Sequence, residues 1–101
     1  MELIMTAGMI SAEEAKACGL VNHVVPLEEL LPLAEKLANK MMRNSSVAIG
    51  AAIRAVNANF EDGVNGYEVE IAEFGECFGT EDFTEGTTAF LEKRKANFPG
   101  S

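Results

Sequence analysis

Two stretches of the chain repeat large apolar residues at intervals of four, three and four positions. The first stripe consists of Ile49, Ile53, Val56 and Phe60, and the second of Tyr67, Ile71, Phe74 and Phe78. Such intervals place apolar side chains on one face of an α-helix, whereas a β-strand would need a period of two. The sequence therefore predicts two amphipathic helices, each with a face ready to pack against another element.

The other side of the first of these helices is lined by alanine, at positions 48, 51, 55 and 58. A face of such small residues permits close approach of a neighbouring element, because the distance between packed helices depends on the side chains at their contact. The chain has more apolar stripes than so small a core can bury. We therefore expect some of them to face a partner or a further part of the protein.

Capping residues and turn formers define further helices. Ser11 and Glu14 have the spacing of a capping box, and Gly19 can supply the left-handed residue that ends the same helix. Asp82, with Glu85 three positions later, is predicted to cap the last helix. The predicted helices cover residues 12–18, 27–43, 47–60, 65–78 and 83–93, and residues 21–25 are predicted to be extended, at most a short strand. The sequence thus predicts an all-α fold, a small bundle of about five helices.

The first ten residues differ from the rest. Residues 2–5 form an apolar turn without a cap of its own, and a helix of four or five residues is not stable alone. We therefore expect residues 1–10 to be the end of a preceding element, residues 11–99 to form one helical domain, and residues 100–101 to be a tail.

Charge and cysteine usage exclude several classes of protein. The 101 residues carry a net charge of −8, which disfavours attraction to nucleic acids and to anionic membranes. No segment has the length and apolar character of a membrane span, and no secretory signal is recognisable. Cys18 and Cys77 lack the spacing of a zinc site or a disulfide framework. We expect a cytoplasmic protein without metal or cofactor, whose partners include neither nucleic acid nor membrane.

Several residues have site chemistry but favour a structural interpretation. Glu70, Glu73 and Glu76 lie three positions apart and can shift one another's pKa, yet they point away from the apolar stripe and are expected to form a solvated face. His23, the only histidine, has no nucleophile or carboxylate near it in the sequence. We expect it to be a surface or structural residue.

Three adjacent cations, Lys93, Arg94 and Lys95, follow a stretch from residue 61 to 92 that holds ten acidic residues and no basic one. Cations at the end of a helix compensate its dipole, and they can also converge on a phosphate. Phe90 precedes them by one turn, where its ring can pack on an adenine or contribute to a core. The residues alone leave these alternatives open.

Two ordered motifs resemble the enoyl-CoA hydratase/isomerase (crotonase) family. Residues 2–15 read ELIMTAGMISAEEA and are followed by GLVN at 19–22 and VVP at 24–26. This segment is similar to the stretch after the catalytic core of that family. Residues 78–98 read FGTEDFTEGTTAFLEKRKANF and resemble the C-terminal signature of the family, in the form found in true hydratases. The resemblance covers nearly the whole chain, with the intervening lengths in register.

The resemblance implies that the sequence corresponds to the helical C-terminal region, which builds the trimer or hexamer in this family. The full subunit would hydrate trans-2-enoyl-CoA to 3-hydroxyacyl-CoA, as in fatty-acid β-oxidation or butyrate-type metabolism, although an isomerase or another crotonase activity stays open. Its two catalytic glutamates and oxyanion hole would lie outside this sequence, so no catalytic residue is expected here. Phe90 and Lys93 match positions that contact coenzyme A across a subunit interface, and Arg94 beside them stays open. The alternative is a freestanding helical module that binds another protein.

Overall fold

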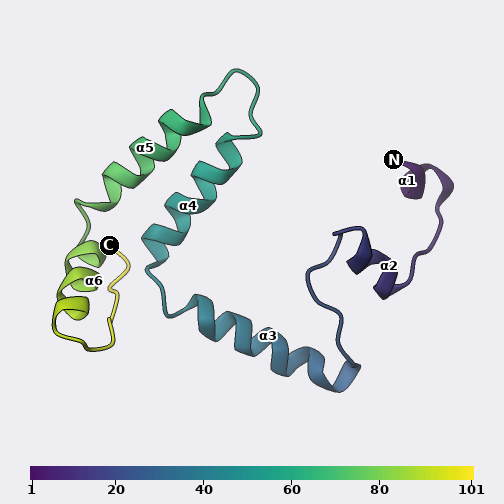
Figure 1. Cartoon of the computed structure of the whole chain (residues 1–101), viewed down its shortest axis with the longest axis horizontal. Coiled ribbons are helices and arrows are strands. Elements are labelled where there is room, and N and C mark those ends of the chain that lie inside the picture. Colours follow the sequence, from purple (N-terminus) through teal and green to yellow (C-terminus); the bar gives the residue numbers. More distant parts are fainter. The chain divides into compact units, whose positions relative to one another are not determined.

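The computed structural model describes all of residues 1–101 and contains six helices and no strand (Figure 1). In chain order they are α1 (Glu2–Thr6), α2 (Ala12–Ala17), α3 (Leu27–Met41), α4 (Ser46–Ala58), α5 (Gly66–Cys77) and α6 (Glu81–Leu91). The predicted all-α fold is confirmed, with one helix more than expected because residues 2–6 complete a helical turn. Residues 21–25, predicted to be extended, form no strand.

The chain divides into two compact units, Met1–Lys36 and Leu37–Ser101. The first contains α1, α2 and most of α3, and the second contains the end of α3 together with α4, α5 and α6. The separate expectation that residues 1–10 end a preceding element stays a prediction.

In the first unit, α2 has the ends that the sequence predicts. The Ser11 hydroxyl accepts a hydrogen bond from the amide of Glu14 at 3.1 Å, and the Ser11 amide donates to the Glu14 carboxylate at 2.8 Å. At the other end Gly19 has a φ of 76°, and the amide of Leu20 donates to the carbonyl of Ala15 at 2.8 Å. This is a Schellman motif, in which the left-handed glycine lets the chain leave the helix while its last carbonyls keep their partners.

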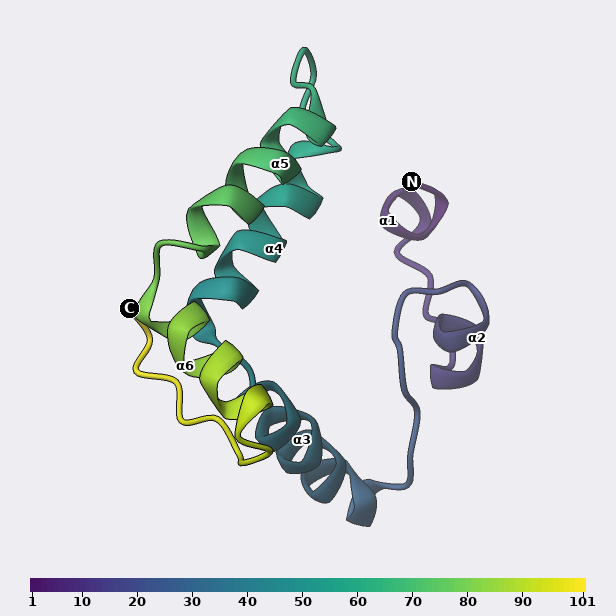
Figure 2. The same cartoon turned by 60° about the vertical axis from the view of Figure 1, so that its left-hand side comes forward.

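In the second unit, α4 and α5 run antiparallel and lie side by side in both views of the chain (Figures 1 and 2). Their contact is made by small residues, since Ala51 and Ala58 are buried. A Cβ atom on Gly66 would lie only 3.2 Å from the Cα of Asn59, so a larger residue there would push the backbones apart. The predicted alanine face is therefore the face on which α5 packs.

The large apolar stripes of α4 and α5 stay uncovered within the chain. Phe60 is 81% exposed and Ile71 is 71% exposed, and no large side chain is fully buried. Three aromatic rings continue this surface toward α6. The ring centroids of Phe74 and Phe78 lie 5.0 Å apart in an edge-to-face arrangement, and those of Phe78 and Phe83 lie 4.6 Å apart. These stripes are therefore exposed within the chain, and the expectation that some of them face a partner or a further part of the protein stays a prediction.

The prediction that Asp82 caps α6 is wrong. The hydroxyl of Thr80 accepts from the amide of Phe83 at 3.0 Å and is the actual cap. Asp82 turns inward instead and is 2% exposed. Its carboxylate accepts from the hydroxyl of Ser45, the cap of α4, and from the amide of Gly100 at 2.7 Å. These hydrogen bonds, with that from Ser45 the strongest, lower the pKa of Asp82 and join α4, α6 and the end of the chain.

Candidate functional site

The last turn of α6 presents Phe90 and Lys93, the two residues that the sequence proposes for coenzyme A contact. Phe90 is 83% exposed, so its ring is part of no core within the chain. The helix ends two residues earlier than predicted because Lys93 has a φ of 55°, in the left-handed region. The amide of Lys93 donates to the carbonyl of Phe90 at 3.2 Å, and the amide of Arg94 donates to that of Ala89 at 3.0 Å. Lys93 thus occupies the position at which a Schellman motif usually has glycine.

The side chain of Lys93 has no partner within the chain. It forms neither an ion pair nor a side-chain hydrogen bond. The three ion pairs of this protein all join an arginine to a glutamate. A non-glycine residue in the left-handed conformation costs about 1–2 kcal/mol. Lys93 thus combines an unpaired side chain with a left-handed φ, and it stands three positions after the exposed Phe90.

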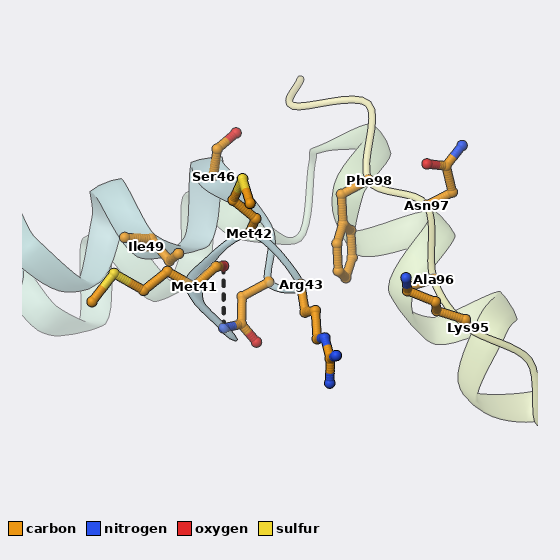
Figure 3. Close-up of a pocket in the computed structure, with 10 residues that line it drawn as sticks. Met41, Met42, Arg43, Ser46, Ile49, Lys95, Ala96, Asn97 and Phe98 are labelled. Atoms are coloured by element: carbon orange, nitrogen blue, oxygen red, sulfur yellow. Dashed lines mark hydrogen bonds between the residues drawn. The ribbon is translucent and has the colours of Figure 1, made fainter. Parts of the chain in front are cut away.

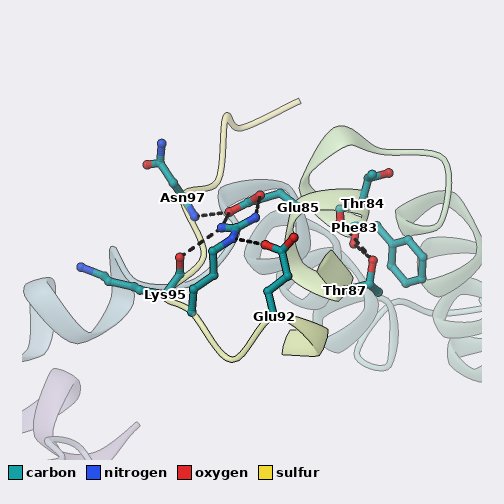
Figure 4. A network of polar contacts seen from close by, with 8 residues as sticks. Phe83, Thr84, Glu85, Thr87, Glu92, Lys95 and Asn97 are labelled. Carbon is teal, nitrogen blue, oxygen red and sulfur yellow. Dashed lines mark hydrogen bonds and ion pairs between the residues drawn. The ribbon is translucent and has the colours of Figure 1, made fainter. Parts of the chain in front are cut away.

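Arg94, in contrast, is engaged inside the chain by Glu85 and Glu92, which Figure 4 labels. Its guanidinium forms a two-pronged ion pair with Glu85, at 2.6 and 2.8 Å, and its Nε donates to Glu92 at 2.6 Å. The amide of Asn97 also donates to Glu85, at 2.6 Å. These contacts raise the pKa of Arg94 and, with the ion pair as the main cause, lower the pKa of Glu85 to about 2. Arg94 is consequently paired with Glu85 and Glu92 within the chain, and its contact with coenzyme A stays an open prediction.

A stability prediction follows from the titration of Glu85. The pKa of Glu85 in the folded chain, about 2, lies below the ordinary glutamate value of 4.5, so the ionised form stabilises the fold. This contribution is fully present above about pH 4.5 and is lost as the pH falls toward 2. We expect urea denaturation at a series of pH values to show stability falling through this window, and Glu85→Gln to flatten the decline. A variant profile parallel to that of the parent chain would contradict this assignment.

A second prediction concerns the left-handed residue. In Lys93→Gly the strain of about 1–2 kcal/mol disappears, while the extra freedom of glycine in the unfolded chain costs about 0.4–1 kcal/mol. We therefore expect a gain of up to about 1 kcal/mol in the free energy of unfolding, measured by urea denaturation. Lys16→Gly, in the last turn of α2, is the control, and it should destabilise because residue 16 has a helical conformation in which glycine is unfavourable. Destabilisation by Lys93→Gly would show that Lys93 is not strained.

Lys95 belongs to another surface. It lines an open groove of about 670 Å³ between the start of α4 and the C-terminal segment, together with Arg43 and Phe98 (Figure 3). Apolar lining comes from Met41 at the end of α3, from Met42 in the following loop and from Ile49 of α4. The three adjacent cations therefore have different surroundings, and Lys93 is the one that accompanies Phe90.

The remaining candidates from the sequence lie in exposed or paired positions. His23, Glu70 and Glu76 are exposed. Glu73 is half-buried rather than fully solvated, because Arg54 of α4 binds it. The Nε and Nη2 atoms of Arg54 each donate to a carboxylate oxygen of Glu73 at 2.7 Å. Cys18 and Cys77 are free thiols. No group of three or more His, Cys, Asp or Glu side chains is arranged to hold a metal ion, and no helix is long and apolar enough to cross a bilayer.

Sequence reasoning missed the roles of Asp82 and Glu85. Both were assigned to a single capping box, whereas Asp82 binds Ser45 and Glu85 binds Arg94. A signal was present in Thr80, a good capping residue that is followed directly by two acidic residues, as the first turn of a helix favours.

Comparison with known proteins agrees with the motifs. A family model described as enoyl-CoA hydratase/isomerase matches residues 1–101. The chain is 44% identical over 98 residues to a crotonyl-CoA hydratase of Syntrophomonas wolfei, covering 96% of this chain and 38% of that protein. It is 43% identical over 95 residues to a short-chain-enoyl-CoA hydratase of Clostridium acetobutylicum, covering 93% and 36%. The chain thus spans less than two fifths of the length of these relatives.

Solved structures give the same result. The fold matches the crystal structure of an enoyl-CoA hydratase from Bacillus anthracis with a TM-score of 0.88 and 38% identity, over 99% of this chain and 39% of that one. A probable enoyl-CoA hydratase/isomerase from Mycobacterium abscessus matches with a TM-score of 0.89 and 29% identity, over 100% and 40%. Because the family model matches all of residues 1–101, the chain belongs to the enoyl-CoA hydratase/isomerase family.

Proposed function

We propose that this chain is the oligomerising and coenzyme A-contacting part of an enoyl-CoA hydratase. The whole protein would add water across the double bond of a trans-2-enoyl-CoA thioester to give a 3-hydroxyacyl-CoA. The proposal is supported by the 44% identity to a crotonyl-CoA hydratase and by the 43% identity to a short-chain-enoyl-CoA hydratase. The C-terminal motif at residues 78–98 resembles the form found in true hydratases rather than in distant relatives of the family.

The observation that carries the oligomerising role is the uncovered apolar surface of α4 and α5. Tyr67, Ile71 and Phe74 are each more than half exposed, while the alanines between the two helices are buried. Large exposed apolar patches mark surfaces that bind another protein. Trimers or hexamers, the assemblies implied by the family resemblance, would cover such a surface with further copies.

The contact with coenzyme A is proposed for Phe90 and Lys93. A phosphate needs a cation that has no partner of its own, and Lys93 is such a cation. An adenine ring needs a flat apolar surface, and Phe90 offers one with 83% of its area exposed. The two residues lie on one turn at the end of α6, close enough in sequence to hold a phosphate and the ring attached to it.

Catalysis is assigned to the rest of the protein. Hydration of the thioester needs donors that stabilise its enolate and carboxyl groups that move protons. The one buried carboxylate of this chain, Asp82, has both oxygens occupied by Ser45 and the amide of Gly100. We therefore expect no hydration of crotonyl-CoA by the 101-residue chain, measured from the loss of absorbance of its conjugated thioester. Turnover would overturn the proposed division of labour.

Titration with coenzyme A, followed by the NMR signals of the chain, tests the contact itself. We expect weak binding that shifts the signals of Phe90 and Lys93 and that Lys93→Asn weakens further. Asparagine tolerates the left-handed conformation, so this variant removes the cation and keeps the turn. Shifts at other residues only, or equal affinity of the variant, would refute the assignment.

A freestanding helical module that binds another protein is the second candidate, because the same exposed apolar surface would serve it. Self-association and coenzyme A binding distinguish the two. A monomeric chain that ignores coenzyme A and binds a different protein through α4 and α5 would favour the module.

A further inference from the structure

The path of the chain after α6 depends on the conformation of Lys93. Residues beyond Lys93 run back along α6, as the two views of the C-terminal segment show (Figures 1 and 2). The amide of Asn97 consequently reaches Glu85 at 2.6 Å, twelve positions earlier in the sequence. With an ordinary helical φ at Lys93, the chain would continue along the helix axis by about 1.5 Å per residue and move away from Glu85. The reversed path of the chain after α6 thus depends on the left-handed conformation of Lys93.

Glu85 holds the first part of this reversed path through Arg94 and Asn97, and Asp82 holds its end through the amide of Gly100. Both carboxylate oxygens of Glu85 bind the guanidinium of Arg94, at 2.6 and 2.8 Å, in the geometry of the strongest side-chain ion pairs (Figure 4). Arg94 also binds Glu92, so the residues before and after Lys93 are joined to each other. With 20% of its side chain exposed, Glu85 is more shielded from water than the side chain of Arg94, of which 41% is exposed.

We propose that Glu85 is a positioning residue: through Arg94 it fixes Lys93 in the left-handed turn and so presents the Lys93 ammonium beside Phe90 for the phosphate of coenzyme A. This inference rests on the proposed contact of Phe90 and Lys93 with coenzyme A. It explains why a lysine occupies a position that favours glycine. The left-handed turn at Lys93 is held by the backbone hydrogen bonds of the helix end and by an ion pair in which Lys93 takes no part, so its ammonium stays free for a ligand.

The test compares Glu85→Gln with Glu73→Gln. Glu73 forms the same kind of two-pronged pair, with Arg54 at 2.7 Å, but it lies on α5 and touches nothing at the end of α6. The first readout is the NMR cross-peak between the amide and α protons of Lys93, which is strong only at positive φ. We expect Glu85→Gln to weaken this cross-peak and Glu73→Gln to leave it unchanged.

The second readout is the affinity for adenosine 3′,5′-diphosphate, measured from the shifts of Phe90 and Lys93. We expect Glu85→Gln to lower this affinity about threefold to tenfold, the cost of ordering one side chain on binding. Glu73→Gln should have no effect. In the background of Lys93→Asn, Glu85→Gln should cause no further loss, because its effect passes through Lys93.

The outcomes separate the inference from the function on which it rests. A normal cross-peak and normal affinity in Glu85→Gln would overturn the positioning role, as would an equal loss of affinity in the background of Lys93→Asn. If the diphosphate shifts neither Phe90 nor Lys93, the proposed contact fails. The positioning role of Glu85 is then judged by the Lys93 cross-peak alone. A cross-peak that stays strong in Glu85→Gln would overturn that role as well.

Discussion

The chain is expected to self-associate at micromolar concentration, and Ile71→Glu is expected to return it to the monomer. Ile71 lies at the centre of the exposed stripe of α5 and is 71% exposed within the chain. If another copy covers this stripe, the new carboxylate would be buried without a partner. That costs about 3–5 kcal/mol, which corresponds to at least about a hundredfold rise in the dissociation constant.

Sedimentation equilibrium over a range of concentrations measures this effect. Ala72→Glu is the matched control, because it adds the same charge at the next position, which is exposed and lies off the stripe. The control should associate like the parent chain. A chain that is monomeric and cooperatively folded at high concentration would contradict the expected use of the stripe, as would equal effects of the two substitutions.

Ala51→Leu is expected to destabilise the second unit by about 1–3 kcal/mol, the usual cost of forcing extra methylene groups into a closely packed contact. Ala51 is 5% exposed and lies where α4 faces α5, and the two helices approach closely enough that a Cβ on Gly66 would lie 3.2 Å from the Cα of Asn59. A leucine at position 51 must either push α5 away from α4 or adopt an unfavourable side-chain rotamer.

Thermal unfolding followed by circular dichroism measures the loss. For a unit of this size, a change of 1 kcal/mol shifts the midpoint by about 4–8 °C. Ala52→Leu is the control, because residue 52 has the same backbone environment in α4 but is exposed. Equal midpoints for the two variants would show that the alanine face does not form the contact.

The local signals of the sequence predicted the helices well. The stripes of α4 and α5, the capping box of Ser11 and Glu14 and the left-handed Gly19 all lie where they were expected. Each of these signals involves residues within one or two turns of each other. Such interactions are decided by spacing and residue type alone, because the helix itself brings the participants together.

The sequence was less informative about which face of a helix is buried. Residue type favours Ile53 and Phe60 as core residues, yet Ala51 and Ala58 are the buried ones. Small side chains allow the backbones of α4 and α5 to approach, and the larger stripes are then left on the outside. Periodicity reports that two faces differ, but it does not report which neighbour the chain supplies.

What the sequence by itself determined is five of the six helices and the family, and it also proposed the pair Phe90 and Lys93. The tertiary structure alone decided the partners of Asp82 and Glu85. Ser45 and Asp82 are 37 positions apart, and Arg94 and Glu85 are nine apart around a chain reversal. Contacts at such separations depend on the path of the chain between them, which no local spacing encodes. The left-handed Lys93 belongs to the same class, because its conformation follows from where the next residues are held.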